Sequence, residues 1–191
     1  MLRDLVLKCR SYRRFHEEII VNSDMLLELV DLARNSASAR NLQPLKYILC
    51  CSIENNARIF PCLRWAGTLK DWTGPEEGEH PSAYIIMLGD KELGANFGID
   101  PGIAAQSILL GAVEKGLGGC MLASVDRPKL RELFAIEERY EILLVIALGK
   151  PKEEVVLEVM EPADPYAYWR DEQKVHHVPK RRLADIIVDQ L

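Results

Sequence analysis

The sequence lacks several features that would assign it to a class at once. No uninterrupted apolar run approaches the ~18 residues that a membrane span needs, and the opening Met-Leu-Arg-Asp does not resemble a signal peptide. The five cysteines form no Cys-x-x-Cys pair and have no metal-ligand spacing with the four histidines. We therefore expect no membrane insertion, no metal site, and a cytoplasmic protein whose thiols stay reduced.

Familiar catalytic signatures are also missing. There is no Gly-x-Ser-x-Gly and no Walker sequence. Gly116-x-Gly118-Gly119 follows a predicted helix and opens a strand, the reverse of a dinucleotide fingerprint, so it indicates a helix stop with close backbone approach. The pair His176-His177 is typical of a solvated strand edge rather than a metal site.

Excess positive charge is absent as well. The chain has 191 residues, enough for one domain with its own core, and its net charge is −5. Such an acidic balance argues against general nucleic-acid binding. The basic residues that do cluster, at 10–14 and 180–182, are therefore local features that need an explanation.

Helices and strands alternate along the chain. Apolar periodicity predicts helices over 22–33, 54–62, 99–115 and 126–134, and strands over 46–51, 83–88, 120–123 and 141–148. This alternation favours an α/β class with a mixed sheet covered on both faces. Residues 61–82 are predicted as a long loop, and 152–180 as a polar tail, after which 181–188 resumes a helix or strand.

The segment Cys9-Arg10-Ser11-Tyr12-Arg13-Arg14-Phe15 holds three guanidiniums and a serine hydroxyl. Arginine presents a fixed fork of donors that matches phosphate oxygens. The alternative is a solvated basic turn paired with Glu17 and Glu18. Lys180-Arg181-Arg182 offers more cations, although it also fits an exposed helix start.

A second polar segment, Ser38-Ala39-Arg40-Asn41-Leu42-Gln43-Pro44, precedes a predicted strand. Its two carboxamides are suited to the polar edge of a planar ring, although they fit loop caps equally well. In combination, the two segments predict a phosphorylated heteroaromatic ligand, and flavin mononucleotide (FMN) fits this description.

These motifs, in this order, resemble those of the nitroreductase family of flavin-dependent oxidoreductases, over nearly the whole chain. The family patterns Arg-Arg-Ser-x-Arg-x-Phe and Pro-Ser-x-x-Asn-x-Gln-Pro-Trp are similar to residues 9–15 and 37–45. The central helix pattern Asp-x-Gly-x-Ala-x-Gln is similar to residues 100–106. Gly-Leu-Gly-x-Cys, Ile-Ala-Leu-Gly-x-Pro and Val-Pro-Lys-Arg follow at 116–120, 146–151 and 178–181.

The resemblance implies an α+β fold with a mixed, largely antiparallel sheet flanked by helices. It implies one FMN-binding domain over 1–191 and a homodimer, in which residues 152–191 form an arm that embraces the partner. The helix predicted over 99–115 is apolar on most sides, which agrees with a subunit interface.

The family's site residues carry over to this chain as expectations. Arg10, Ser11 and Arg13 would bind the phosphate and ribityl end of FMN, joined by Lys180 and Arg181, so the two basic stretches should converge. Ser38, Asn41 and Gln43 would meet the flavin, and the backbone of Leu122, Ala123 and Ser124 would donate hydrogen bonds near its reactive ring. Three positions depart from the family pattern, namely Cys9 for Arg, Ala37 for Pro and Leu45 for Trp.

The resemblance also implies the reaction. Hydride would pass from NADH or NADPH through flavin N5 to a small oxidised acceptor, such as a nitroarene or quinone, in a ping-pong cycle. Arg13 would stabilise the anionic reduced flavin, and no protein nucleophile is needed. Trp65, Leu69 and Trp72 would contact the acceptor, or else only pack their loop onto the core. Alternatives are a flavin-binding protein without nicotinamide turnover and a flavin-consuming or dehalogenating enzyme on the same scaffold.

Overall fold

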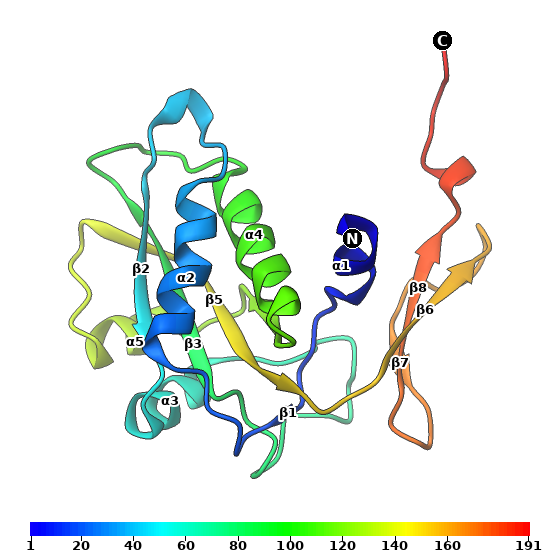
Figure 1. Cartoon of the computed structure of the whole chain (residues 1–191), viewed down its shortest axis with the longest axis horizontal. Helices are drawn as coiled ribbons and strands as arrows, with labels where there is room; N and C mark the ends of the chain where they lie inside the picture. Colours follow the sequence, from blue (N-terminus) through cyan, green and yellow to red (C-terminus); the bar gives the residue numbers. More distant parts are fainter.

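The computed structural model describes all residues, 1–191, and contains two sheets and five α-helices (Figure 1). The larger sheet has the strand order β1-β5-β3-β2, with β4 also paired to β5. Its strands are β1 (Phe15–His16), β2 (Leu45–Cys50), β3 (Ala83–Asp90), β4 (Gly118–Leu122) and β5 (Tyr140–Pro151). Every pair in it is antiparallel. The α+β expectation is therefore confirmed, and the α/β interpretation from helix–strand alternation is wrong.

Four of the five helices pack on the two faces of this sheet, and the N-terminal helix contacts the helix at 100–114 instead. The five helices are α1 (Leu2–Lys8), α2 (Ser23–Arg34), α3 (Ile53–Ile59), α4 (Asp100–Glu114) and α5 (Arg127–Leu133). Side-chain oxygens cap three of them as their sequences suggest, because Asn22, Ser52 and Asp126 accept hydrogen bonds from backbone N–H groups in the first turns of α2, α3 and α5. No helix is both long enough and apolar enough to cross a bilayer.

Strand β3 is buried along its whole length and divides the interior into two cores. Ala83, Ile85 and Met87 face the core that α2 and α4 cover. The alternate residues Tyr84, Ile86 and Leu88 face the core that includes residues of α3 and α5. A strand with period-two side chains therefore supplies both layers.

Helix α4 packs closely on α2 through Gly111. A Cβ added there would lie 2.3 Å from Leu32 Cδ1 and 3.0 Å from Leu29 Cδ2, so any larger residue would force these leucine side chains to shift. The helix ends at Glu114, and Gly116, two residues further on, has a φ of +71°. The following glycines lie in β4, where a Cβ on Gly119 would be 2.4 Å from the Ala147 carbonyl oxygen. The predicted helix stop with close backbone approach is confirmed.

The C-terminal region differs from the predicted polar tail. It forms a second sheet, in which β8 (His176–Arg181) pairs in parallel with β6 (Val155–Met160) and antiparallel with β7 (Trp169–Arg170). Figure 1 shows this sheet standing apart from the main body, on the side of α1. Beyond Arg181 only a short 3₁₀ turn, Leu183–Asp185, is formed, so the helix or strand expected over 181–188 is wrong. We call residues 152–191 the C-terminal arm.

Candidate functional site

The N-terminal arginine segment and the C-terminal arm meet in one cavity of about 270 Å³, which we call the basic pocket. Three cations converge on it and no aspartate or glutamate lines it. The expected convergence of the two basic stretches is thus present within a single chain. The lining residues are Cys9, Arg10, Ser11, Arg13, Tyr168, His176, Val178 and Lys180. Arg181 is at the exposed end of β8 and does not line the pocket.

Backbone contacts hold the arginine segment against β4. Ser11 forms an isolated β-bridge with Gly119, and the Tyr12 N–H donates to the Gly119 carbonyl oxygen at 3.0 Å. The arm is attached by Glu153, a buried residue whose carboxylate accepts from the backbone N–H of Arg13 and from Arg170 Nη2 at 2.8 Å. A buried carboxylate beneath the pocket therefore joins the chain's first fifteen residues to its last forty.

Arg13 is the most enclosed cation of the basic pocket, with 8% of its surface exposed. Its guanidinium carbon lies 4.8 Å from the centroid of the Tyr168 ring, and its Nη1 lies 3.4 Å from His176 Nε2. The Nε atoms of Arg13 and Arg10 are buried without a hydrogen-bond partner in the protein. Unsatisfied donors of this kind are costly, and an anion in the pocket would satisfy them.

Neither histidine of the arm lies at a solvated strand edge, so that interpretation is wrong. His176 is 1% exposed, and burial, together with the neighbouring charges of Arg13 and Arg170, lowers its pKa to about 4. It is therefore neutral at pH 7, and its Nδ1 has no partner. His177 lies 2.6 Å from Glu158 Oε1 and 3.2 Å from Asp171 Oδ2, contacts that raise its pKa.

Arg14 is adjacent in sequence but does not belong to the basic pocket. Its Nε and Nη2 donate to the two carboxylate oxygens of Glu79, both at 2.6 Å. This bidentate contact with Arg14 is the main reason that the pKa of Glu79 falls to about 2. Arg14 therefore pairs with Glu79 rather than with Glu17 or Glu18. It cannot take the place of the family arginine that is Cys9 in this chain.

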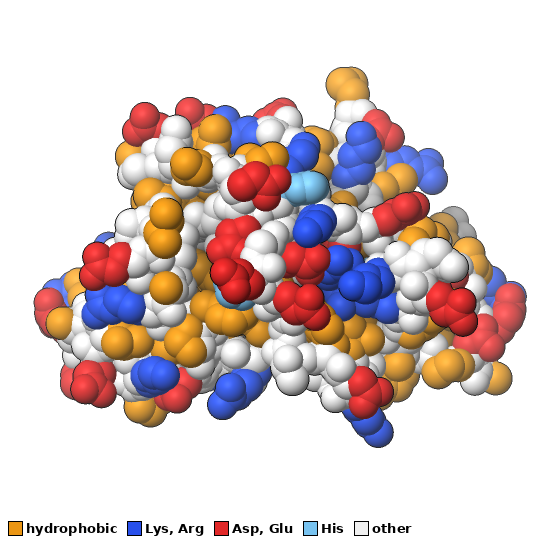
Figure 2. Space-filling view, turned by 90° about the horizontal axis from the view of Figure 1, so that it is seen from below, with side chains coloured by type: hydrophobic (Ala, Val, Ile, Leu, Met, Phe, Trp, Pro, Cys, Tyr) orange, Lys and Arg blue, Asp and Glu red, His pale blue; other side chains and the backbone are white.

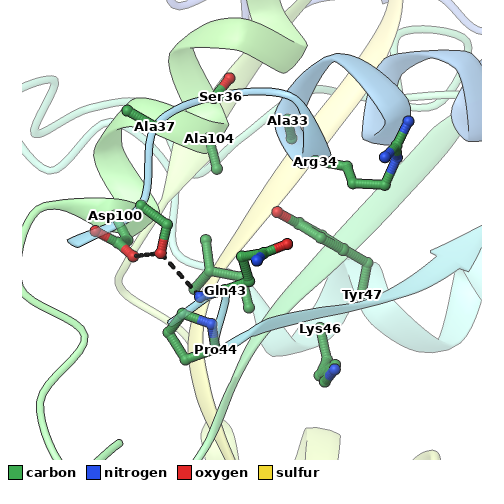
Figure 3. A pocket seen from close by; sticks show the side chains of 12 residues that line it. Ala33, Arg34, Ser36, Ala37, Gln43, Pro44, Lys46, Tyr47, Asp100 and Ala104 are labelled. Atoms are coloured by element: carbon green, nitrogen blue, oxygen red, sulfur yellow. Dashed lines mark hydrogen bonds between the residues drawn. The ribbon is translucent and has the colours of Figure 1, made fainter. Parts of the chain in front are cut away.

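Residues 38–44, which we call the amide loop, form a tight arrangement at the start of α4 (Figure 3). The Ser38 hydroxyl donates to Asp100 Oδ2 at 2.6 Å and accepts from the Gln43 N–H at 2.9 Å. The Ala39 N–H also donates to Asp100 Oδ1, at 3.0 Å. Asp100 is 3% exposed, and these hydrogen bonds satisfy both of its carboxylate oxygens.

The backbone of the amide loop is strained. Arg40, Asn41 and Gln43 have φ values of +54°, +55° and +51°, a region that residues other than glycine rarely adopt. Ser38 and Gln43 line a cavity of about 240 Å³ together with Tyr47 and Asp100, whereas Asn41 is exposed outside it. The surrounding contacts therefore fix the loop in an unfavourable conformation, a pattern typical of ligand-binding segments.

Helix α4 connects the amide loop to the basic pocket. Asp100 in its first turn holds the loop, and Gln106 donates to Cys9 Sγ at 3.5 Å. Six residues of helix separate these contacts, about 9 Å along the axis. The two cavities share no lining residue within one chain.

The predicted backbone donors lie at the end of β4. Leu122 is buried and pairs with Val145. Ala123 and Ser124 follow it as exposed residues, and their carbonyl oxygens accept from Arg127 Nη2 at 3.1 Å and from the Arg64 N–H at 3.0 Å. These contacts fix the conformation of the segment.

The three residues expected to contact an acceptor are divided between two environments. Trp65 is buried, and its ring centroid lies 5.9 Å from that of Phe60 in the core. Leu69 and Trp72 instead line a cavity of about 630 Å³ between their loop and the arm. Arg170 of the arm lies over the Trp72 ring, 4.2 Å from its centroid. Only Leu69 and Trp72 therefore face a space that a flat molecule could enter.

Sequence reasoning missed Tyr168, His176, Glu153 and Asp100. Tyr168 and His176 reach the basic pocket only because the arm folds into a sheet, and no spacing signal marks them. Glu153 carries no local signal, since its contact with Arg13 joins residues that are far apart in the sequence. Asp100 belongs to the helix motif at residues 100–106. Its position at a helix start, directly before Pro101, is the sequence signal that could have indicated its role.

Comparisons with known proteins identify the family of this chain. The model of the family described as "Nitroreductase family" matches residues 6–150. A Bacillus subtilis (strain 168) protein named "Putative NAD(P)H nitroreductase YodC" is 25% identical, over 76% of this chain and 87% of that protein. The family match covers well over half of the chain, so this protein belongs to the nitroreductase family.

Solved structures show the same fold. A nitroreductase family protein from Clostridium novyi NT superposes with a TM-score of 0.67 at 24% identity, over 80% of this chain and 86% of that chain. An FMN-dependent nitroreductase from Clostridium difficile R20291 gives a TM-score of 0.64 at 22% identity, over 78% of this chain and 87% of that chain.

Proposed function

We propose that this protein is an FMN-dependent oxidoreductase that transfers hydride from NADH or NADPH to a small oxidised acceptor in a ping-pong cycle. The observation that carries the proposal is the basic pocket, in which Arg10, Arg13 and Lys180 converge without a lining carboxylate. The names of the B. subtilis relative and of the C. difficile protein, which mention NAD(P)H and FMN, agree with it.

The residues present fit FMN. The buried, unpartnered Nε atoms of Arg10 and Arg13 suit a phosphate, and the Ser11 hydroxyl adds a neutral donor. Neutral His176 has one ring nitrogen without a partner, so it can contact the same anion without adding charge. When bound, FMN would supply hydride transfer through its N5 position.

The other residues of the site would orient the ring. Ser38, Asn41 and Gln43 would present hydroxyl and amide groups to its polar edge, and the backbone at Leu122–Ser124 would lie near the reacting position. Because Arg13 lies in the basic pocket, we assign its charge to the phosphate end rather than to the ring. Leu69 and Trp72 would contact the acceptor, whereas Trp65 would support their loop from the core.

We further propose that the complete site requires a homodimer. The basic pocket and the amide loop line separate cavities in one chain, so a second copy would bring the two kinds of surface together. The C-terminal arm ends in exposed apolar side chains, with Ile186 61% and Val188 102% exposed, which a partner would cover. Light scattering of the flavin-loaded protein should give twice the chain mass, with one FMN per chain.

Spectroscopy and kinetics test the activity. The purified protein should be yellow, release FMN on denaturation, bleach anaerobically with NADH or NADPH, and recover its colour with a quinone or a nitroarene. Steady-state plots at several acceptor concentrations should give the parallel lines of a ping-pong cycle. Bound flavin that stays oxidised would instead identify a binding protein without turnover, and net loss of FMN would identify a flavin-consuming enzyme. A colourless protein that does not bind added FMN would refute the proposal.

A further inference from the structure

A cavity of about 620 Å³ lies beside α3 and shares no lining residue with the basic pocket, the amide-loop cavity or the cavity at Trp72. Its walls come from α3, from residues 17–20 after β1, and from residues 80–84 at the start of β3. We call it the α3 cavity. Its volume lies within the range of small-molecule sites. Tyr84 belongs to the core on the α3 and α5 side of the sheet, opposite the core beneath the amide loop.

Three residues of this cavity carry buried polar atoms without a hydrogen-bond partner in the protein: Tyr84 Oη, Ser82 Oγ and Asn56 Oδ1. Tyr84 is fully buried and Ser82 is 9% exposed. The Asn56 amide is fixed because its Nδ2 donates to the Ser82 carbonyl oxygen at 2.8 Å, which leaves its oxygen as a free acceptor. Each unsatisfied group costs about 1–3 kcal/mol, so three in one cavity indicate a polar ligand.

The charge of the α3 cavity is negative. Glu17 and Glu18 line it, and no lysine or arginine does. Glu17 is held in place because its Oε2 accepts from the N–H groups of Gly78 at 2.7 Å and of His80 at 3.2 Å. Its other oxygen lies 3.6 Å from His80 Nδ1. Burial, and to a smaller extent the charge of Glu17, raise the pKa of Tyr84.

Apolar surface borders the same cavity. The Phe60 ring lies against His80 with a centroid distance of 4.0 Å. Ile53 and Ile20, at the rim, are 89% and 74% exposed. Figure 2 views the molecule from below, the side on which α3 lies, and shows acidic side chains near the centre of this face, with basic side chains directly beside them and apolar side chains around. The cavity thus combines a fixed negative charge, free acceptors and an apolar edge.

We propose that the α3 cavity binds a small organic amine in its ammonium form, with a short apolar or aromatic body. The ammonium group has three donors and no acceptor, which matches Glu17, Asn56 Oδ1 and the hydroxyl oxygens of Ser82 and Tyr84. The body of the ligand lies against Phe60 and Ile53. This site is separate from the proposed flavin site, and its ligand takes no part in the proposed hydride transfer.

Benzylamine is the probe, and benzyl alcohol and benzoate are its neutral and anionic counterparts. Protein-observed NMR of the whole chain should show saturable shifts around α3 with benzylamine, with a Kd of about 1 mM. Benzyl alcohol should bind at least about tenfold more weakly, because it lacks the charge that Glu17 attracts. Benzoate should not bind. Absence of saturable shifts with benzylamine, or equal binding of benzoate, would overturn the proposal.

Variants locate the site. Ala57→Trp changes an exposed helix position that lines the cavity, so it should abolish benzylamine binding without unfolding the protein. Glu17→Gln should weaken benzylamine binding about tenfold, whereas Glu77→Gln, which changes an exposed carboxylate outside the cavity, should leave it unchanged.

Tyr84→Phe removes an unsatisfied hydroxyl, so it should raise the melting temperature of the free protein. The same variant should weaken benzylamine binding. Unchanged benzylamine binding in Ala57→Trp would place the amine elsewhere and refute the assignment.

Discussion

The basic pocket and the amide loop differ in how their polar groups are satisfied. In the basic pocket, arginine Nε atoms and a histidine nitrogen remain buried without partners. In the amide loop, Asp100, Ser38 and the backbone of Ala39 and Gln43 satisfy one another. The first arrangement gains its missing contacts only from an anion, whereas the second holds a strained backbone ready before any ligand arrives. Charge and preorganisation are therefore supplied by separate parts of the chain.

The largest expected effect follows from removing the enclosed charge of the basic pocket. Arg13→Ala should raise the Kd for FMN at least about 100-fold, because a charge-assisted contact to a buried anion is lost. Equilibrium titration of the flavin-free protein measures it, with Arg64→Ala, an exposed arginine outside this pocket, as the control. Circular dichroism checks folding, and Arg10→Ala provides a second, less buried test. Unchanged flavin affinity in both variants would remove these arginines from the site.

The neighbouring Arg14 sharpens the comparison, because its charge is already satisfied by the protein. Glu79→Gln should lower the free energy of unfolding by about 2 kcal/mol, since it breaks a half-buried bidentate pair. The FMN affinity should change by less than about twofold, within the spread expected for independent sites. Denaturant titration measures the first effect and flavin titration the second. A large loss of flavin affinity would mean that Arg14 also serves the pocket.

The same pair predicts a pH dependence. The pKa of Glu79 is lowered in the folded protein to about 2 from its ordinary value of 4.5, so its contribution to stability is complete above pH 4.5. That contribution is lost as the pH falls from 4.5 towards 2, because the folded state must then take up a proton that the unfolded state already holds. The stability difference between wild type and Glu79→Gln should shrink over this range. A difference that stays constant down to pH 2.5 would contradict the assignment.

A smaller effect is expected from loosening the amide loop. Asp100→Asn preserves the shape of the side chain but weakens its hydrogen bonds with Ser38 and Ala39, so the strained loop should become less ordered. We expect FMN to bind about tenfold more weakly, because part of the preorganisation is lost. Asp24→Asn, an exposed carboxylate on α2, is the control. If flavin binding is unaffected, the loop does not depend on Asp100 for its function.

The smallest effect belongs to the exposed cation of the pocket. Lys180→Ala should weaken FMN binding about fivefold, since solvent and salt screen an exposed ammonium. Adding salt should weaken the wild type more than the variant, so that the gap closes towards 0.5 M. Lys91→Ala, on the exposed segment after β3, is the control. A gap independent of salt would show that Lys180 acts through packing rather than charge.

Much of the main sheet could be predicted from the sequence because its signals are local. The buried strands at 83–90 and 140–151 contain long apolar runs, and Asn22 and Asp126 mark helix starts by their own side-chain chemistry. The meeting of Arg10 and Arg13 with Lys180 was also expected, because the order of the motifs resembles that of a family. Their roles toward FMN stay a prediction.

The remainder depends on contacts between distant residues. Strand β8 is short, rich in polar residues and interrupted by a proline, so nothing in its periodicity separates it from a loop. Strand β6 is mostly apolar, with one charged residue among six, and its signal was overlooked inside a segment that is otherwise polar. Arg13 and Glu153 are 140 positions apart, and the burial of His176 exists only after the arm has folded. Arg40 and Asn41 have a left-handed backbone although neither is glycine, so the sequence does not mark this conformation. The hydrogen bond of Ser38 with Asp100 holds the loop in it.

The way in which Glu153 attaches the arm has an energetic consequence. One wall of the basic pocket belongs to the arm and another to the N-terminal segment, so an anion bound there contacts both. Thermodynamic linkage makes the two effects equal. If a docked arm strengthens anion binding by a given free energy, the bound anion stabilises the docked arm by the same amount. If the anion is FMN, as proposed above, FMN should protect the last forty residues from proteases, and fixing the arm in place should tighten FMN binding.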